Sequence, residues 1–158
     1  MDSINEYKLS QVWTFYIHLQ NTSDWSYASY YKIMPMHTVY DAIHMIQEVP
    51  FEIIKKTILF VMRDNVKPMW EDEHCKDGGQ WSMKLPKTHS NKYWEDLCLA
   101  LIGDLFTEEN EVHGIVIQVK PNFDSLQIWN KSGKKQASID TLKDDIVLNL
   151  NPEDSITI

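Results

Sequence analysis

The chain has 158 residues, of which 43% are hydrophobic and 24% are charged, and its formal net charge is −8. This length and composition are typical of one globular domain and exclude a disordered chain. No apolar run approaches the roughly 20 residues that a membrane-spanning helix needs, and the acidic start is unlike a secretory leader. The negative charge also excludes a protein that grips many nucleic-acid phosphates. Any RNA recognition should therefore be concentrated in a pocket.

The chain shows no repeat, linker or low-complexity tract, so we expect a single domain over residues 1–158. Its two cysteines, Cys75 and Cys98, follow no disulfide spacing. This favours a reducing compartment, the cytoplasm or the nucleus.

In the first half of the chain, three segments rich in β-branched and aromatic residues are expected to be strands. They are residues 12–19, 30–34 and 57–62. Thr38, with Asp41 three residues later, predicts a capping box at the start of a helix. Val39, Ile43 and Ile46 continue at helical spacing. A polar loop, residues 21–24, precedes Trp25.

In the second half, a turn at Gly78 and Gly79 precedes an expected strand over 80–85, and 112–120 with 125–131 predict a hairpin. Ser90 is predicted to cap a helix with one apolar stripe facing a sheet. The stripe consists of Trp94, Leu97, Cys98, Leu101, Ile102 and Leu105.

Ser138 is expected to cap a last helix that carries Ile139, Leu142, Ile146 and Leu150, and residues 154–158 a short terminal strand. Because most strands come in adjacent pairs, we predict an α+β fold. It would be a curved, mainly antiparallel sheet with helices on one face.

Enzymatic chemistry has little support. There is no Gly-x-Ser-x-Gly motif, phosphate loop or dinucleotide fingerprint. Cys98 lies on the apolar helix stripe, which favours a core thiol over a nucleophile. A metal site at His74 and Cys75 would need ligands from adjacent residues, which rarely converge on one ion. We therefore expect no enzyme, metal or cofactor.

The placement of the tryptophans points to a binding pocket instead. Trp25 and Trp70 lie in polar segments, whereas buried core tryptophans normally lie in strands or helix stripes, as we expect of Trp13, Trp81 and Trp94. Trp70 is followed directly by Glu71, so a flat π face and a two-oxygen acceptor occur together. A flat, cationic ligand with N–H donors along one edge, such as a methylated guanine, would suit this pair.

The segment Pro68-Met69-Trp70-Glu71-Asp72-Glu73, followed by Gly78-Gly79-x-Trp81, strongly resembles the cap-binding translation initiation factor 4E family. The similarity extends from about Leu9 to Ile158. Further matches are Trp13, Phe15, Tyr16, Trp25, Tyr93, Trp94, Leu101, Ile102, Gly103, Ile128 and Trp129.

The resemblance implies a cupped antiparallel sheet, backed on its convex face by three helices, that binds the 7-methylguanosine cap of messenger RNA. Trp25 and Trp70 would sandwich the methylated base. Glu71 would accept hydrogen bonds from the guanine edge, and Trp129 would lie against the N7-methyl group. A cation between two indole faces gains on the order of 2 kcal/mol when it is desolvated.

The phosphate-binding positions of the family are altered. Gln80 and Ser125 replace two basic residues, and Lys120 stands in place of an arginine. Lysine lacks the planar fork with which arginine holds a phosphate. Candidate replacements follow Trp129 in the sequence. They are Lys131, Lys134 and Lys135.

The family's convex face binds a helical peptide of the initiation scaffold protein or of repressors. The key tryptophan of that surface corresponds to Ile43 here, and Glu95 replaces a leucine. Val39 and Leu99 remain apolar, and Asp96 retains an acid. Because an indole is a usual hot spot of such contacts, we expect an altered partner surface.

The sequence thus predicts a non-enzymatic protein that binds capped messenger RNA and acts in translation initiation, in the cytoplasm or also the nucleus, without a membrane. One alternative is a divergent, compact member, for instance a viral one, that represses or protects capped RNA without recruiting the scaffold. Another is a 4E-like protein-interaction module that has lost cap binding.

Overall fold

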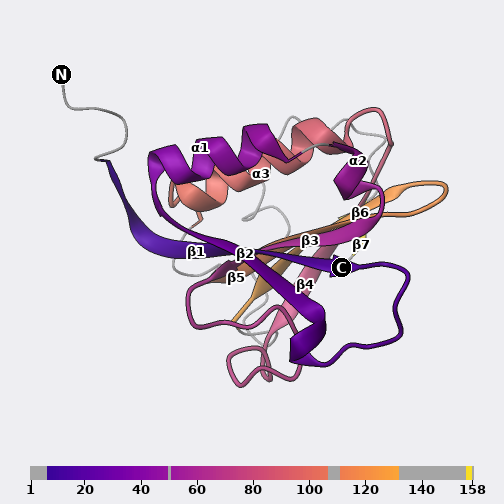
Figure 1. Ribbon diagram of the computed structural model, residues 1–158, viewed down its shortest axis with the longest axis horizontal. Coiled ribbons are helices and arrows are strands. Elements are labelled where there is room, and N and C mark those ends of the chain that lie inside the picture. Colours follow the sequence, from indigo (N-terminus) through magenta and orange to yellow (C-terminus); the bar gives the residue numbers. More distant parts are fainter. Residues whose placement is uncertain (1–6, 50, 107–110, 132–155, 158) are drawn as a thin grey trace.

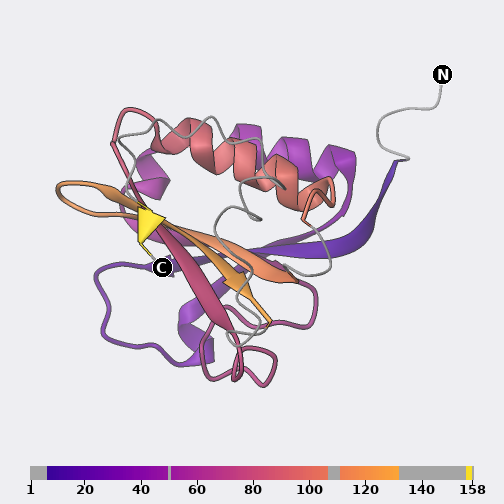
Figure 2. The same ribbon diagram turned by 180° about the vertical axis from the view of Figure 1, so that it is seen from behind.

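The computed structural model describes residues 7–49, 51–106, 111–131 and 156–157. Within them the strands form a single sheet in the order β2-β1-β3-β5-β6-β4-β7, and every strand pair is antiparallel. The helices α1 and α3 lie side by side over one face of this sheet (Figure 1). The reverse view shows the same two layers (Figure 2). The predicted α+β fold, with a curved antiparallel sheet, is confirmed.

The strands are β1 (Lys8–Leu19), β2 (Tyr30–Thr38), β3 (Thr57–Arg63), β4 (Gly79–Leu85), β5 (Val112–Val119), β6 (Asp124–Asn130) and β7 (Ile156–Thr157). The helices are the 3-10 turn η2 (Tyr27–Ser29), α1 (Val39–Glu48), α2 (Phe51–Ile54) and α3 (Ser90–Ile102).

Each predicted strand is present, and two of them extend four residues beyond their predicted bounds. β1 begins at Lys8, and β2 continues through Pro35 to Thr38. Pro35 is tolerated because β2 is the edge strand of the sheet, where an N–H on the outer side needs no partner. The terminal strand β7 pairs with β4 over Ile156–Thr157, and the other residues predicted for this strand lie outside the described residues.

The predicted start of helix α1 is confirmed. The Thr38 hydroxyl accepts from the Asp41 N–H at 3.1 Å, and the Asp41 carboxylate accepts from the Thr38 N–H at 2.9 Å. This reciprocal pair satisfies N–H groups that have no partner within the helix. It fixes the junction between β2 and α1.

The prediction that Ser90 caps α3 is wrong. Ser90 is the first residue of the helix, and the N-cap residue is His89. The Ser90 hydroxyl instead donates to Asp124 at 2.6 Å, a residue on β6. The predicted stripe also extended too far, since α3 ends at Ile102 and Leu105 is 57% exposed.

The predicted helix from Ser138 to Leu150 lies outside the described residues. Helix α2, a single turn after α1, was not predicted. It has only four residues, too few for an amphipathic period to be seen in the sequence.

The sheet has an apolar cluster on each face because successive side chains of a strand point to opposite sides. The face under the helices holds the larger cluster, which includes Trp13, Trp81 and Trp94, so these tryptophans are core residues as predicted. The opposite face holds a smaller cluster that includes Phe60 and Trp129. This second cluster forms the floor of the site described next.

Candidate functional site

A cavity of about 250 Å³ lies on the face of the sheet opposite the helices. Its volume is slightly below the roughly 300 Å³ at which pockets for small molecules begin. It is lined by Trp25, Tyr30, Ile58, Phe60, Pro68, Met69, Trp70, Glu71, Val116, Gln118, Gln127 and Trp129. The cavity thus brings together the aromatic residues and the carboxylate that the sequence predicted as the base-binding set.

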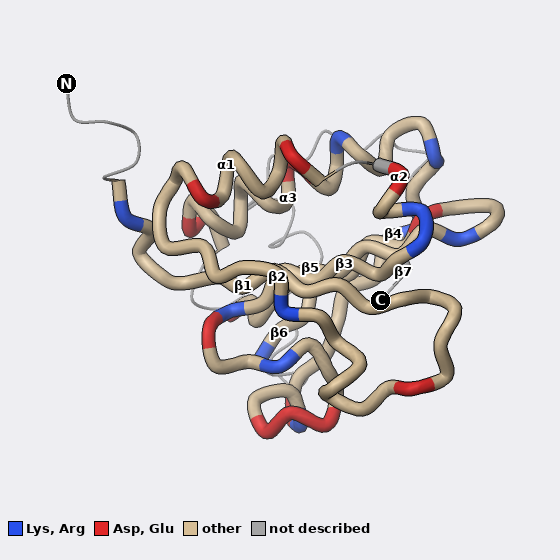
Figure 3. Tube along the Cα trace, viewed as in Figure 1, with Lys and Arg blue, Asp and Glu red and all other residues tan. Residues whose placement is uncertain are grey.

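Two loops contribute the exposed part of this lining. One joins β1 to β2 and carries Trp25, and the other joins β3 to β4 and carries Trp70 and Glu71. Both loops project from the sheet on the side away from the helices (Figure 1). In the charge view the β3–β4 loop shows a run of acidic residues (Figure 3).

Trp25 is held from behind by His18 of β1. The two rings are stacked with centroids 4.1 Å apart and an interplanar angle of 8°. His18 is fully buried, and its Nε2 lies 2.9 Å from the Asp24 carbonyl oxygen and 3.1 Å from Ser29 Oγ. Since a carbonyl can only accept, Nε2 carries the proton and donates. One face of the indole is therefore covered, while Trp25 as a whole stays 52% exposed.

Trp70 is arranged in a similar way. Its ring stacks on Trp129 with centroids 4.5 Å apart and an interplanar angle of 26°, and Trp70 remains 47% exposed. Trp129 is itself buried, and its indole N–H donates to Gln127 Oε1 at 3.1 Å. Each of the two exposed tryptophans thus has one covered face and one available face.

The cavity is electrostatically negative on one side. Glu71 is exposed and lines the cavity. Burial raises the pKa of the Tyr30 hydroxyl, and the nearby Glu71 carboxylate raises it further. A negative charge beside aromatic faces favours a cationic ring with N–H donors along its edge.

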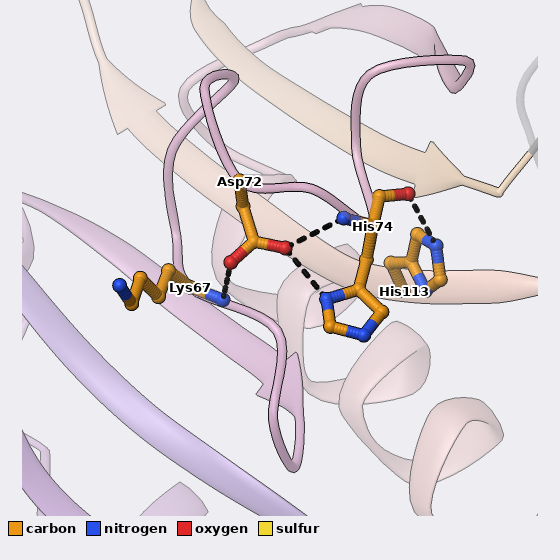
Figure 4. A network of polar contacts seen from close by, with 4 residues as sticks. All are labelled: Lys67, Asp72, His74 and His113. Carbon is orange, nitrogen blue, oxygen red and sulfur yellow. Dashed lines mark hydrogen bonds and ion pairs between the residues drawn. The ribbon is translucent and has the colours of Figure 1, made fainter.

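The loop that carries Trp70 and Glu71 is fastened by Asp72 (Figure 4). The Asp72 carboxylate accepts from the backbone N–H of Lys67 at 3.2 Å and of His74 at 2.9 Å, and it lies 2.8 Å from His74 Nδ1. Burial by itself raises the pKa of Asp72, but these hydrogen bonds together outweigh it and hold the pKa below its usual value. His113 of β5 in turn donates from Nε2 to the His74 carbonyl oxygen at 3.0 Å.

Three of the predicted phosphate positions, Gln80, Ser125 and Lys120, belong to the sheet or to its β5–β6 turn and do not line the cavity. Gln80 of β4 pairs with Trp129, and Ser125 of β6 is buried and pairs with Gln118. Lys120 directly follows β5, and its Nζ lies 5.7 Å from the centre of the Phe123 ring. Lys120 therefore supplies the positive charge among these three positions.

The candidate replacements are less favourably placed or are not described. Lys131 follows the opposite end of β6 from Lys120, and its Nζ forms an ion pair with Glu111 at 3.1 Å. Lys134 and Lys135 lie outside the described residues. Sequence reasoning missed His18 and Gln127, whose roles depend on neighbours in the sheet. Their only sequence signal is a polar residue in an otherwise apolar strand.

The predicted partner surface lies in the helix layer. Val39 and Ile43 belong to α1, and Asp96 and Leu99 to α3. Leu99 is 53% exposed, and the other three are partly buried.

The cysteines and histidines form no further reactive centre in the described part of the chain. Burial raises the pKa of the Cys75 thiol to about 11 and that of Cys98 well above its usual value, so neither is a ready nucleophile. No group of three metal-ligating side chains is found among the described residues. None of the described helices is long and apolar enough to cross a membrane.

The fold is shared with solved structures of cap-binding proteins. eIF4E-3 of C. elegans, in complex with the 4E-binding protein Mextli and cap analog, superposes with a TM-score of 0.81 at 17% identity, covering 96% of this chain and 92% of that chain. eIF4E-3 of Ascaris suum with m7G cap gives a TM-score of 0.76 at 22% identity, covering 90% of this chain and 85% of that one. These two structural similarities show that this chain has the same fold as both proteins.

The sequence identifies the family. The chain matches the model of eukaryotic initiation factor 4E over residues 8–157, and it belongs to that family. The translation initiation factor NCBP of Oryza sativa subsp. japonica is 35% identical over 101 residues, which are 64% of this chain and 44% of the relative. The isoform 4E-2 of Triticum aestivum is 29% identical over 141 residues, covering 83% of this chain and 66% of the relative. The match thus spans less than half of the rice protein.

Proposed function

We propose that this chain binds the 7-methylguanosine 5′ cap of messenger RNA and acts in translation initiation. The observation that carries the proposal is the cavity that joins Trp25, Trp70 and Glu71 over a floor formed by Trp129. Of the solved structures with this fold, eIF4E-3 of C. elegans is in complex with cap analog and eIF4E-3 of Ascaris suum is in complex with m7G cap.

The geometry suits the chemistry of a methylated guanine. Methylation at N7 makes the base cationic, and the free faces of Trp25 and Trp70 offer π density on either side. The Glu71 carboxylate would accept from N1–H and the exocyclic amine, a bidentate contact that adenine cannot satisfy. A bound base would cover the exposed Glu71 carboxylate, and an acceptor that is buried and left unsatisfied costs roughly 1–3 kcal/mol, so the same contact provides specificity.

The role we propose is binding rather than catalysis. Both cysteines are buried with raised pKa values, and recognition of the base uses stacking and hydrogen bonds alone. We place the protein in the cytoplasm, where capped messages are translated.

A titration with nucleotides tests this function. Tryptophan fluorescence should quench with 7-methyl-GTP at concentrations at least tenfold below those needed for GTP, since only the methylated base is cationic. Trp70→Ala and Glu71→Gln should each remove most of the difference. Tyr40→Ala and Glu48→Gln, exposed residues of α1 in the other layer, are matched controls. An equal response to both nucleotides would overturn the proposal.

We also infer a helical peptide partner on the convex surface formed by Val39, Ile43, Asp96 and Leu99. Mextli in the C. elegans complex is described as a 4E-binding protein. A scaffold-derived peptide should bind more weakly than it binds relatives with tryptophan at the position of Ile43, and Ile43→Trp should strengthen binding. If no such peptide binds either form, a role in repressing or protecting capped RNA is favoured.

A further inference from the structure

The turn of the β5–β6 hairpin carries an aromatic ring that two lysines approach. Lys84 Nζ lies 5.1 Å from the centre of the Phe123 ring, and Lys120 Nζ lies 5.7 Å from it. Both distances are within the range of roughly 6 Å for a cation–π contact. Lys84 comes from β4, and Lys120 and Phe123 flank the hairpin turn. Lys84 on β4 and Lys120 after β5 therefore approach Phe123 from the two strands that flank β6.

Among the described residues, no carboxylate is paired with either of these two ammonium groups. In the described part of the chain neither Lys84 nor Lys120 takes part in an ion pair. The adjacent Asp124 is fully buried, and it is engaged with Lys87 Nζ at 3.1 Å and with the Ser90 hydroxyl at 2.6 Å. Two like charges beside one ring repel each other, and an anion between them would remove that cost. In a chain of net charge −8 these two lysines form a local concentration of positive charge.

This site continues the floor of the cavity. Ser125 pairs with Gln118 on one side and with Lys84 on the other, so the three residues form one row across β5, β6 and β4. Gln118 itself lines the cavity. Lys120 is two residues beyond Gln118, which places it about 7 Å further along the strand at about 3.3 Å per residue. The path from the cavity to Phe123 is thus lined by amide, hydroxyl and ammonium groups.

We propose that Phe123, Lys84 and Lys120 form a second nucleotide subsite, which holds the first nucleotide joined to the cap. This rests on the proposed cap-binding function. The lysines contact the bridging phosphates, and the base of the attached nucleotide stacks on Phe123. The phosphates that join the two bases lie over the row Lys84-Ser125-Gln118, in which Lys84 is exposed, Gln118 is partly exposed and Ser125 is buried. Lys84 thereby supplies a positive charge that the substituted positions Gln80 and Ser125 lack.

Stacking on one aromatic ring accepts any base because every base has a π face. The subsite should therefore strengthen binding of capped RNA without selecting a sequence. Because Lys84 is exposed and Lys120 is partly exposed, the phosphate part of the affinity should fall as salt is raised.

The test is calorimetric titration of the whole chain with 7-methylguanosine, 7-methyl-GTP and the dinucleotide cap m7GpppA. Phe123→Leu keeps apolar volume and removes the π face, so it should raise the Kd of m7GpppA about tenfold and that of 7-methyl-GTP less than about twofold. Lys84→Gln should raise the Kd of both phosphate-containing ligands by roughly three- to tenfold at low salt. Lys92→Gln removes the same charge from the helix layer, where Lys92 pairs with Asp96, and is the matched control.

Phe123→Tyr retains a stacking ring, and it should keep the wild-type Kd for m7GpppA if the ring is the contact. The subsite is overturned if Phe123→Leu changes the Kd values of m7GpppA and 7-methyl-GTP equally, or changes neither. It is also overturned if Phe123→Tyr behaves like Phe123→Leu, because that result indicates a packing role. If 7-methylguanosine itself does not bind, the cap-binding function fails, and the subsite fails with it.

Discussion

The imidazole of His18 lies nearly parallel to the indole of Trp25, with ring centroids 4.1 Å apart and planes inclined by 8°. The histidine is fully buried, and its Nε2 donates to the Asp24 carbonyl just before Trp25 in the chain. It therefore supports the indole in two ways, by its flat face and by a hydrogen bond to the loop. Without this support, the Trp25 side chain would be mobile in the free protein. Binding of a base would then have to order it, and this entropic cost would lower the affinity.

Replacing His18 should therefore weaken recognition of the base. We expect His18→Ala to raise the Kd of 7-methyl-GTP roughly two- to tenfold, the equivalent of one aromatic pair. His18→Phe keeps the flat face and loses the donor, whereas His18→Gln keeps a donor and loses the ring. Recovery by Phe would assign the effect to stacking, and recovery by Gln would assign it to the hydrogen bond. Unchanged binding in all three variants would refute a positioning role.

Gly114 leaves no room for a side chain beneath the site. A Cβ at this position would lie 2.4 Å from Met62 Sδ and 2.6 Å from the Val61 carbonyl oxygen. Gly114 is also paired with Trp129, so any displacement reaches the floor of the cavity. We expect Gly114→Ala to lower the free energy of unfolding by about 1–3 kcal/mol and to weaken 7-methyl-GTP binding.

Urea denaturation measures the stability part of this prediction. Gly103→Ala is a milder comparison, because the nearest atom to its Cβ is the Leu99 carbonyl oxygen at 3.0 Å. Equal effects of the two substitutions would show that the close contacts of Gly114 with β3 do not cause the loss of stability.

Asp72 should stabilise the loop that presents Trp70 and Glu71. Asp72→Asn removes the charge that accepts from the Lys67 and His74 N–H groups, and we expect it to cost about 1–3 kcal/mol. Glu73→Gln, an exposed neighbour, is the matched control. Because the pKa of Asp72 is lowered in the folded protein, its contribution is complete at neutral pH and is lost as the pH falls below about 4. Acid unfolding of Asp72→Asn should accordingly be less steep than that of the wild type, and identical profiles would contradict the assignment.

His113 should make the free energy of unfolding depend on pH closer to neutrality. Burial lowers the pKa of His113, and the nearby Arg63 charge lowers it further, although the hydrogen bond to His74 opposes this. The unfolded chain then binds a proton more readily than the folded one, so stability is full above about pH 6.5 and declines as the pH falls toward the folded pKa. Thermal unfolding between pH 7.5 and 5.5 should show a lower slope for His113→Gln, which keeps a donor for the His74 carbonyl. A slope equal to that of the wild type would remove His113 as the cause.

Local patterns were sufficient for most of the architecture. The continuous apolar run at residues 57–62 indicated the central strand, and the Thr38–Asp41 pair located the start of α1. Trp25 and Trp70 could be separated from the core tryptophans because their neighbours in the sequence are polar. Ser90 shows the limit of this approach, since its hydroxyl is drawn to Asp124, a residue 34 positions away.

The sequence by itself determined the family, the positions of the strands and the residue types of a base-binding pocket, because these depend on short-range periodicity and a compact motif. Only the tertiary structure decided which side chains meet. It placed His18 behind Trp25, and it brought Lys84 to Phe123 and Lys120. Strand order and register are set by long-range pairing across the sheet, and side-chain periodicity fixes a residue's face but not its neighbour.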